Sequence, residues 1–251
     1  MKSAGSPLAD ILALLERCSE AELFSVIEYL AHRCPDQLSD IVNRQEHPLE
    51  VEWKISGDVI LDAIARSSDL TKRGIRGILA EAVFEKEVLP ILPERESVKI
   101  PADAAFDFEL RRRFSPADAA RIQVKLQRSE KHQPMLVSKR LRATLTNPPV
   151  QLYVVEIQKT RGGKNRKGQK TRPYRFGDFD ILAVSMHPST DDWKNFRYTL
   201  CSWLIPRKYE QTLIKILQPV AAEPDEYWTD SLSECLEWFD QGAKKTLYQE
   251  K

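Results

Sequence analysis

The sequence predicts an α/β fold, of the α+β kind with a mixed sheet. Helices flank this central sheet, and an N-terminal helical region precedes the core. Before residue 90, apolar residues recur at helical spacing. After residue 100 they alternate with polar residues, as in half-buried strands, and segment 179–186 is apolar almost throughout, as in a buried central strand. We therefore divide the chain into an N-terminal helical region, 1–60, and a core with a C-terminal helix, 61–251.

The helical pattern of the first region covers residues 8–46, where Ser19 and Glu22 have the spacing of a capping box. A second helix is predicted around 58–65. A longer one opens at Asp69 or Thr71 and continues through residue 89, before two prolines.

This longer helix has a predicted buried stripe formed by Ile75, Ile78, Leu79, Ala82, Val83 and Leu89. Glu81 and Glu85 lie one turn apart on the flank of that stripe, on the same side as Gly74, whose lack of a side chain would admit another backbone. Glutamates in such a position are most often solvated helix surface.

Two alternating segments predict the strands of one antiparallel hairpin. In 106–110 the apolar residues share one face, and Asp107 lies on the other. In 122–127 the polar face carries Gln123, Lys125 and Gln127. Residues 116–118, Pro-Ala-Asp, provide turn chemistry between the two segments.

Further strands are predicted at 152–159 and 179–186, and the second of these should be central and buried. Asp180 opens it, as a structural hydrogen-bonding residue. An aromatic region, 193–203, a segment at 213–220 and a C-terminal helix around 231–239 complete the chain.

Overall composition names no partner, because 38 basic residues face 37 acidic ones. The four cysteines are far apart, and the sequence contains neither a signal segment nor a membrane span, so we expect a cytoplasmic protein with no membrane partner. Residues 157–177, however, carry eight positive charges and no acidic residue. Such a run is usually a solvated loop, but it could also hold a polyanion.

The motifs of several enzyme classes are absent, including the Walker phosphate loop, the dinucleotide fingerprint and the His-Glu-x-x-His zinc motif. What remains is a carboxylate on one strand, an oxygen ligand and a lysine two residues apart on its partner, and a basic loop downstream. This set suits metal-dependent phosphodiester hydrolysis, because hard cations prefer oxygen ligands and an ammonium group counters transition-state charge.

These residues resemble a known family. Asp107, followed by Gln123-Val124-Lys125, is similar to the Asp and (Asp/Glu)-x-Lys signature of the PD-(D/E)XK nuclease superfamily in a glutamine-substituted form. The helix with Glu81, and the order of elements over 70–186, also resemble the superfamily core, with type II restriction endonucleases nearest in size and layout. Two departures are Phe106, where a proline is usual, and Gln123, where a second carboxylate is usual.

The resemblance implies a restriction-endonuclease-like core and a type II restriction enzyme, a Mg²⁺-dependent endonuclease that hydrolyses double-stranded DNA, with Mn²⁺ as a substitute. Asp107 and Gln123 would be metal ligands, Lys125 catalytic, and Glu81 or Glu156 a helper. An alternative ligand pair is Glu156 with Gln158, with Asp118 or Asp107 as its partner; Glu85 is a further candidate to complete the site.

The basic run supplies the predicted DNA-binding residues, and Lys131, just beyond the second strand, is expected to matter little. A homodimer is compatible with this interpretation. Two other functions stay open: a non-catalytic nucleic-acid-binding module and a DNA repair nuclease of the same fold. The DNA-binding set is Lys159, Arg161, Lys164, Arg166, Lys167, Lys170 and Arg172.

Overall fold

The structure is a computed structural model that describes residues 17–33, 47–92, 94–98, 100–101, 104–113, 115–131, 133–159 and 172–248. The chain forms two compact units, Met1–Ser67 and Ser68–Lys251. The boundary between them falls after helix α5, a few residues beyond the predicted division. The assignment of two domains stays a prediction.

The first unit is helical where it is described. The predicted capping box is confirmed, because the Ser19 backbone N–H donates to Glu22 at 2.8 Å at the start of the first helix. A short helix that the sequence analysis did not predict is capped by His47. Its helices are α2 (Glu20–Arg33), α4 (Pro48–Trp53) and α5 (Gly57–Arg66).

The second unit is built around a five-stranded mixed sheet in the order β1-β2-β3-β7-β8, which confirms the predicted fold class. All neighbours are antiparallel except the parallel pair β3 and β7. Strand β7 is interior and buried at every residue, as predicted for this apolar segment. The strands are β1 (Arg95–Val98), β2 (Phe108–Arg112), β3 (Ser115–Leu126), β7 (Ile181–Ser185) and β8 (Phe196–Leu200).

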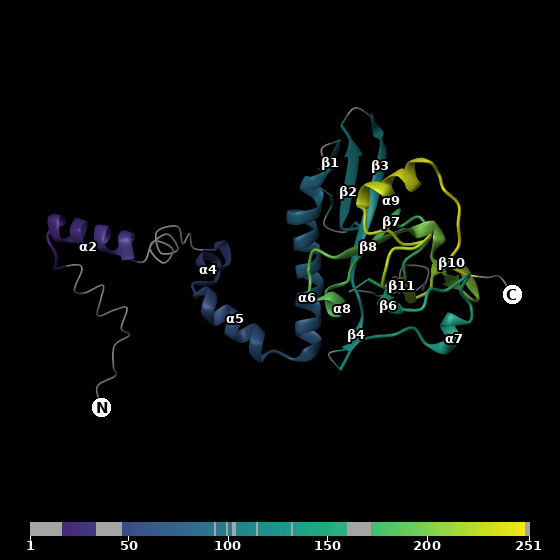
Figure 1. Ribbon diagram of the computed structural model, residues 1–251, viewed down its shortest axis with the longest axis horizontal. Coiled ribbons are helices and arrows are strands. Elements are labelled where there is room, and N and C mark those ends of the chain that lie inside the picture. The colour runs from purple at the N-terminus through teal and green to yellow at the C-terminus, as the bar shows by residue number, and fades with distance from the viewer. Residues whose placement is uncertain are drawn as a thin grey trace. The chain divides into compact units, whose positions relative to one another are not determined.

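Helix α6 (Asp69–Val83) packs along β3 and continues into a π-helical turn, η1 (Phe84–Val88), and a 3-10 turn, η2 (Leu89–Ile91) (Figure 1). Ala80 and Phe84 are its fully buried residues. The Phe84 ring lies 5.3 Å from the ring of Phe108 and 5.4 Å from that of Phe196. The helix therefore covers the apolar face of the sheet.

The predicted buried stripe of this helix is wrong in part. Ile78 and Leu79 are 64% and 44% exposed, and the space beside Gly74 is open rather than filled by another backbone. The reason is that the large Phe84 ring fixes the rotation of the helix, so the face of Ala80 turns inward instead.

The predicted turn at 116–118 is also wrong, because these residues lie inside β3. Arg111 pairs with Ala119, but Arg112 pairs with Ser115, so the three residues between form a bulge. Proline and aspartate suit a bulge as well as a turn, since a bulge leaves N–H groups unpaired.

The remaining strands form small sheets beside the main one. The strand predicted at 152–159 is shorter, β6 (Leu152–Glu156), and it pairs with β11 (Leu217–Ala221) outside the main sheet. These strands are β4 (Ser129–Glu130) with β5 (Gln133–Pro134), β6 (Leu152–Glu156) with β11 (Leu217–Ala221), and β9 (Pro206–Arg207) with β10 (Glu210–Ile214).

The predicted C-terminal helix is confirmed. It begins after Ser231, whose hydroxyl accepts the Glu234 N–H, and it packs on β8. None of the helices in the described ranges is long and apolar enough to cross a membrane. The remaining helices and the last 3-10 turn are α7 (Lys139–Arg142), α8 (His187–Thr190), η3 (Cys201–Trp203) and α9 (Leu232–Asp240).

Candidate active site

Asp107 lies where β2 separates from β3. The ladder between these strands runs from Arg112 only as far as Phe108, whereas β3 continues to Leu126. The backbone N–H of Val124 would be left unpaired by this separation, and the Asp107 carboxylate accepts it at 2.8 Å. The carboxylate therefore takes the place of a strand neighbour and is held at a fixed point on the sheet edge.

Gln123 is buried and holds Asp107 from the adjacent position on β3. Its amide Nε2 donates to the Asp107 carboxylate and to the Val124 carbonyl, the latter at 3.2 Å. Its Oε1 accepts the hydroxyl of Tyr174 at 2.8 Å. In this orientation the amide presents nitrogen, not oxygen, to the carboxylate.

Lys125 lies two residues further along the same strand, and its Nζ donates to the Val124 carbonyl at 3.0 Å. Because side chains alternate along a strand, Lys125 and Gln123 share the face opposite Val124. The Lys125 Nζ also lies 5.8 Å from the centre of the Tyr174 ring.

Glu81 reaches the same point from helix α6. It lies on the packed side of the helix, one position after the buried Ala80, and it is close enough to Asp107 and Lys125 for both to alter its pKa. Glu85, one turn later, is exposed. Of the two glutamates singled out on this helix, the structure brings only Glu81 to the cluster, which we call the carboxylate–lysine cluster: Glu81, Asp107, Gln123 and Lys125.

The cluster is electrostatically strained. Burial, with the Asp107 charge beside it, raises the pKa of Glu81 to about 7, while Lys125 opposes this effect. Burial also raises the pKa of Asp107 and lowers the pKa of Lys125. Each charge is desolvated more than its neighbours compensate, as is common where groups are arranged for chemistry or for a ligand.

Tyr174 is a member of this region that the sequence analysis missed. It lies 51 positions from Gln123, at the end of the basic run, and no motif marks it. Besides its bond to Gln123, its ring lies 5.1 Å from the Lys159 Nζ. Lys159 also pairs with Asp178 at 3.3 Å.

The predicted DNA-binding residues are only partly described. The Lys159 N–H donates to the Arg172 carbonyl at 2.9 Å, and the Arg172 side chain is exposed. The two ends of the basic run thus meet beside Tyr174. The other predicted residues lie outside the described ranges: Arg161, Lys164, Arg166, Lys167 and Lys170.

Glu156 is engaged elsewhere. It forms an ion pair with Arg128 and accepts a hydrogen bond from Gln158, its proposed co-ligand. It lies on β6, outside the main sheet. Asp118 belongs to β3, but its side chain lies outside the described part of the structure. The predicted structural role of Asp180 is confirmed, because its carboxylate binds the Arg121 guanidinium at 2.8 Å and the Arg121 N–H at 2.9 Å.

The donor set of the cluster fits a hard divalent cation in part. Two carboxylates, Asp107 and Glu81, and the Val124 carbonyl supply oxygens only, the ligand type that Mg²⁺ and Mn²⁺ prefer. Within the described ranges, no three His, Cys, Asp or Glu side chains gather as a metal site. The third oxygen would be the Val124 carbonyl or, with its amide reversed, Gln123.

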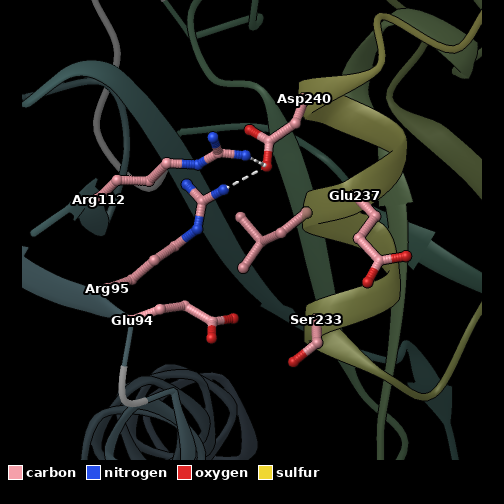
Figure 2. Close-up of a pocket in the computed structure, with 7 residues that line it drawn as sticks. Glu94, Arg95, Arg112, Ser233, Glu237 and Asp240 are labelled. Atoms are coloured by element: carbon pink, nitrogen blue, oxygen red, sulfur yellow. Dashed lines mark hydrogen bonds and ion pairs between the residues drawn. The ribbon is translucent and has the colours of Figure 1, made fainter. Parts of the chain in front are cut away.

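A separate pocket of about 380 Å³ lies at the other end of β2, lined by β1 and helix α9 (Figure 2). There Asp240 accepts hydrogen bonds from both Arg95 and Arg112, as the dashed lines show. Arg112 is the last residue of β2 and Asp107 directly precedes its first, so this pocket is not part of the carboxylate–lysine cluster.

Comparison with known proteins places few limits on these assignments. No protein-family model matches the chain, and no curated protein matches it. Among solved structures, the chain is similar to the bacterial homing endonuclease I-Ssp6803I, with 16% sequence identity and a TM-score of 0.35 over 68% of this chain and 95% of the other.

Proposed function

We propose that the protein is a metal-dependent endonuclease that hydrolyses phosphodiester bonds in double-stranded DNA, with the carboxylate–lysine cluster as its active site. One observation carries the proposal. Residues from α6, from the position just before β2 and from the end of β3 converge where the two strands separate. Asp107 and Lys125 both affect the pKa of Glu81, and each affects the pKa of the other. This is the set that the resemblance to the PD-(D/E)XK superfamily implies.

Asp107 and Glu81 would hold the cation, which supplies Lewis-acid stabilisation of charge on the phosphate. Their mutual repulsion supports this role, because a cation between two desolvated carboxylates compensates charges that Lys125 alone does not. Mg²⁺ is the proposed cofactor, with Mn²⁺ as a substitute.

Gln123 can serve in two ways that differ by a half-turn of its amide. As oriented, it donates to Asp107 and fixes that carboxylate. After a half-turn, its Oε1 would face the cation, and its Nε2 would donate to Tyr174, whose hydroxyl can accept as well as donate. The glutamine can thus be a ligand despite lacking a negative charge.

Lys125 acts on the reacting atoms. Its Nζ is anchored by the Val124 carbonyl, and its remaining hydrogens can hold the attacking water or a phosphate oxygen. Because burial lowers its pKa, the ammonium gives up a proton more readily than an exposed lysine does. It can therefore orient the water and counter the charge that develops in the transition state.

The test is incubation of the purified protein with a mixed-sequence plasmid, with Mg²⁺ and with a chelator. We expect cutting with Mg²⁺ that is lost in Glu81→Gln but kept in Glu85→Gln, a matched control one turn away and exposed. Full cutting in chelator would contradict the metal mechanism. Binding without cutting under every condition would indicate the non-catalytic module instead.

The same experiment separates two biological roles. Discrete fragments would indicate a type II restriction enzyme, which is our proposal. Nicks or a smear would indicate a repair nuclease or another nuclease of low specificity.

A further inference from the structure

A basic cleft lies beside the carboxylate–lysine cluster, and the sequence analysis did not assign it. It has a volume of about 270 Å³, and it is formed by the first turns of α6 and the hairpin of β4 and β5. Figure 1 shows the start of α6 next to β4. Its charged lining consists of Arg73, Arg76, Arg128 and Lys131, against Asp69 and Glu130.

The cations of this cleft are largely uncompensated. Arg128 pairs with Glu156, but its Nε is buried with no hydrogen-bond partner. Within the described part of the chain, Arg73, Arg76 and Lys131 have no ion-pair partner. With four cations against two carboxylates, the lining has a net positive charge, and a concave surface of net positive charge attracts polyanions.

Two elements lead directly from the cleft to the cluster. On α6, Arg76 precedes Glu81 by five residues, which is ~7.5 Å along a helix. On the β3 side, Arg128 follows Lys125 by three residues, or ~10 Å of extended chain. The cleft is therefore adjacent to the cluster along both of its walls.

This separation fits a nucleic-acid strand. Successive nucleotides of one DNA strand advance about 3.4 Å along the helix axis and also rotate about it, so ~10 Å spans at most about three nucleotides. A phosphate at the cluster would place a phosphate of the same strand at the cleft a few nucleotides away. Arginine and lysine side chains are the usual partners of such phosphates.

We propose that this cleft holds the phosphate backbone of the substrate strand a few nucleotides from the cleaved bond. The proposal rests on the proposed function for its substrate. It reverses the expectation for Lys131, which becomes a phosphate contact. The cleft would also be a DNA contact that is independent of the basic run at 157–177.

The test is a double variant, Arg73→Ala with Lys131→Asn, in which both altered side chains are exposed. Asparagine is chosen because Lys131 has a φ of 50°, a conformation that asparagine tolerates. The matched control removes two exposed charges elsewhere, Lys86→Ala with Lys244→Asn. Circular dichroism establishes that both variants are folded.

The measurement is affinity for a short mixed-sequence duplex, in chelator, over a range of salt concentrations. We expect the cleft variant to bind at least about tenfold more weakly, and the slope of log affinity against log salt to fall by about 2. The control should change neither quantity. Competition by inorganic phosphate at concentrations that leave bulk ionic strength unchanged would indicate a site for a small free anion and overturn the proposal.

The outcomes distinguish this proposal from the proposed function. Equal affinity and salt slope in the cleft and control variants would overturn the cleft, even if the protein cuts DNA. Loss of affinity in the cleft variant alone would support the cleft, even if the unmutated protein never cuts. Failure of the unmutated protein to bind duplex in chelator would overturn the cleft but not the proposed function, which plasmid cutting with Mg²⁺ tests separately.

Discussion

The two ends of β2 carry polar clusters of opposite character. At the Arg112 end, Asp240 is shared by two arginines, and the Arg95 side chain, 4% exposed, lies 2.6 Å from it (Figure 2). At the other end, Asp107 and Glu81 share a single lysine, and the pKa of each carboxyl is raised. The cluster at Asp240 has more positive than negative groups, and the carboxylate–lysine cluster has more negative than positive groups.

Under the proposed function, one strand would serve stability at one end and chemistry at the other. A carboxylate between two guanidinium groups is compensated without a ligand. Two desolvated carboxylates beside one ammonium are not compensated, so their burial makes sense if a cation or a reacting group completes the set. The predictions below test this division, beginning with the largest effect.

The largest expected effect is on catalysis. We expect Lys125→Ala to lower the rate of DNA cleavage by on the order of a thousandfold or more, because its interactions strengthen as the phosphorus becomes five-coordinate. DNA affinity should stay within about tenfold, or roughly 1.4 kcal/mol. Single-turnover cleavage and equilibrium binding measure the two quantities.

Asp107→Ala should match this loss of rate and also weaken binding of the metal, since it removes the anchoring carboxylate. Lys86→Ala, which removes an exposed lysine, is the control and should leave the rate unchanged. Cleavage by Lys125→Ala near the unmutated rate would mean that the active site lies elsewhere, with Glu156 and Gln158 the next candidates.

The opposite end of β2 should respond in stability instead. Arg95→Met removes the more buried partner of Asp240 while keeping an aliphatic side chain, and we expect it to lower the free energy of unfolding by about 2 to 3 kcal/mol. The cleavage rate of the folded protein should not change. Denaturant titration, with plasmid cutting well below the midpoint of unfolding, measures both.

The control for this variant is an exposed ion pair of the same unit. Lys194 lies 2.7 Å from Glu87, with side chains 67% and 46% exposed. Lys194→Met should lower the free energy of unfolding much less than Arg95→Met does, because solvent screens the exposed pair. A similar loss of stability in both variants would mean that the Arg95–Asp240 pair contributes no more to the free energy of unfolding than an exposed ion pair does.

The sequence predicted the elements whose residues are specified by neighbours in the chain. The capping box at Ser19, the buried strand β7 and the start of α9 after Ser231 all rest on local patterns, and all are confirmed. The alternation in β3 also placed Gln123 and Lys125 on one face. Strand periodicity alone is therefore enough to bring these two side chains into one candidate site.

What the sequence did not predict depends on contacts between distant segments. The rotation of α6 is set by the packing of Phe84 on Phe108 and Phe196, so the apolar Ile78 and Leu79 were wrongly placed inside. Tyr174 reaches Gln123 only because the chain returns across the polar face of the sheet. Sequence periodicity does not predict a contact between segments so far apart in the chain.

A smaller effect, and one of unusual sign, is expected at Glu81. Its pKa rises from 4.5 to about 7 on folding, so the ionised form is disfavoured in the folded protein. Stability should therefore fall as the pH rises from about 4.5 to about 7. Without metal at pH 8, Glu81→Gln should stabilise the protein by between about 1 and 2 kcal/mol. This is less than the whole pKa shift of Glu81 corresponds to, because the side chain is partly exposed and solvent screens it.

At pH 4, where Glu81 is protonated in both folded and unfolded protein, the stabilisation by Glu81→Gln should vanish. Glu85→Gln is the control, because Glu85 is exposed and one turn away, and it should change the free energy of unfolding little. Unfolding titrations at the two pH values make the comparison. Destabilisation by Glu81→Gln at pH 8 would mean that Lys125 already compensates this carboxylate and that the cluster is a structural ion pair, like the one at Asp240.

The smallest expected effect concerns Tyr174, which lies against the cluster without touching the reacting groups. Burial, with the charge of Asp107 nearby, raises the pKa of its hydroxyl well above the usual range, so it remains a donor to Gln123 at any working pH. Tyr174→Phe leaves one buried polar atom of Gln123 without its partner, whichever way the amide faces. We expect a loss of about 1 kcal/mol in stability and a cleavage rate within about tenfold of the unmutated protein.

Tyr174→Leu also removes the ring beside Lys125 and Lys159 and should cost more stability. If Tyr174→Phe lowers the rate as much as Lys125→Ala does, the hydroxyl belongs to the chemistry, and the division between supporting and reacting groups at this end of β2 has to be redrawn.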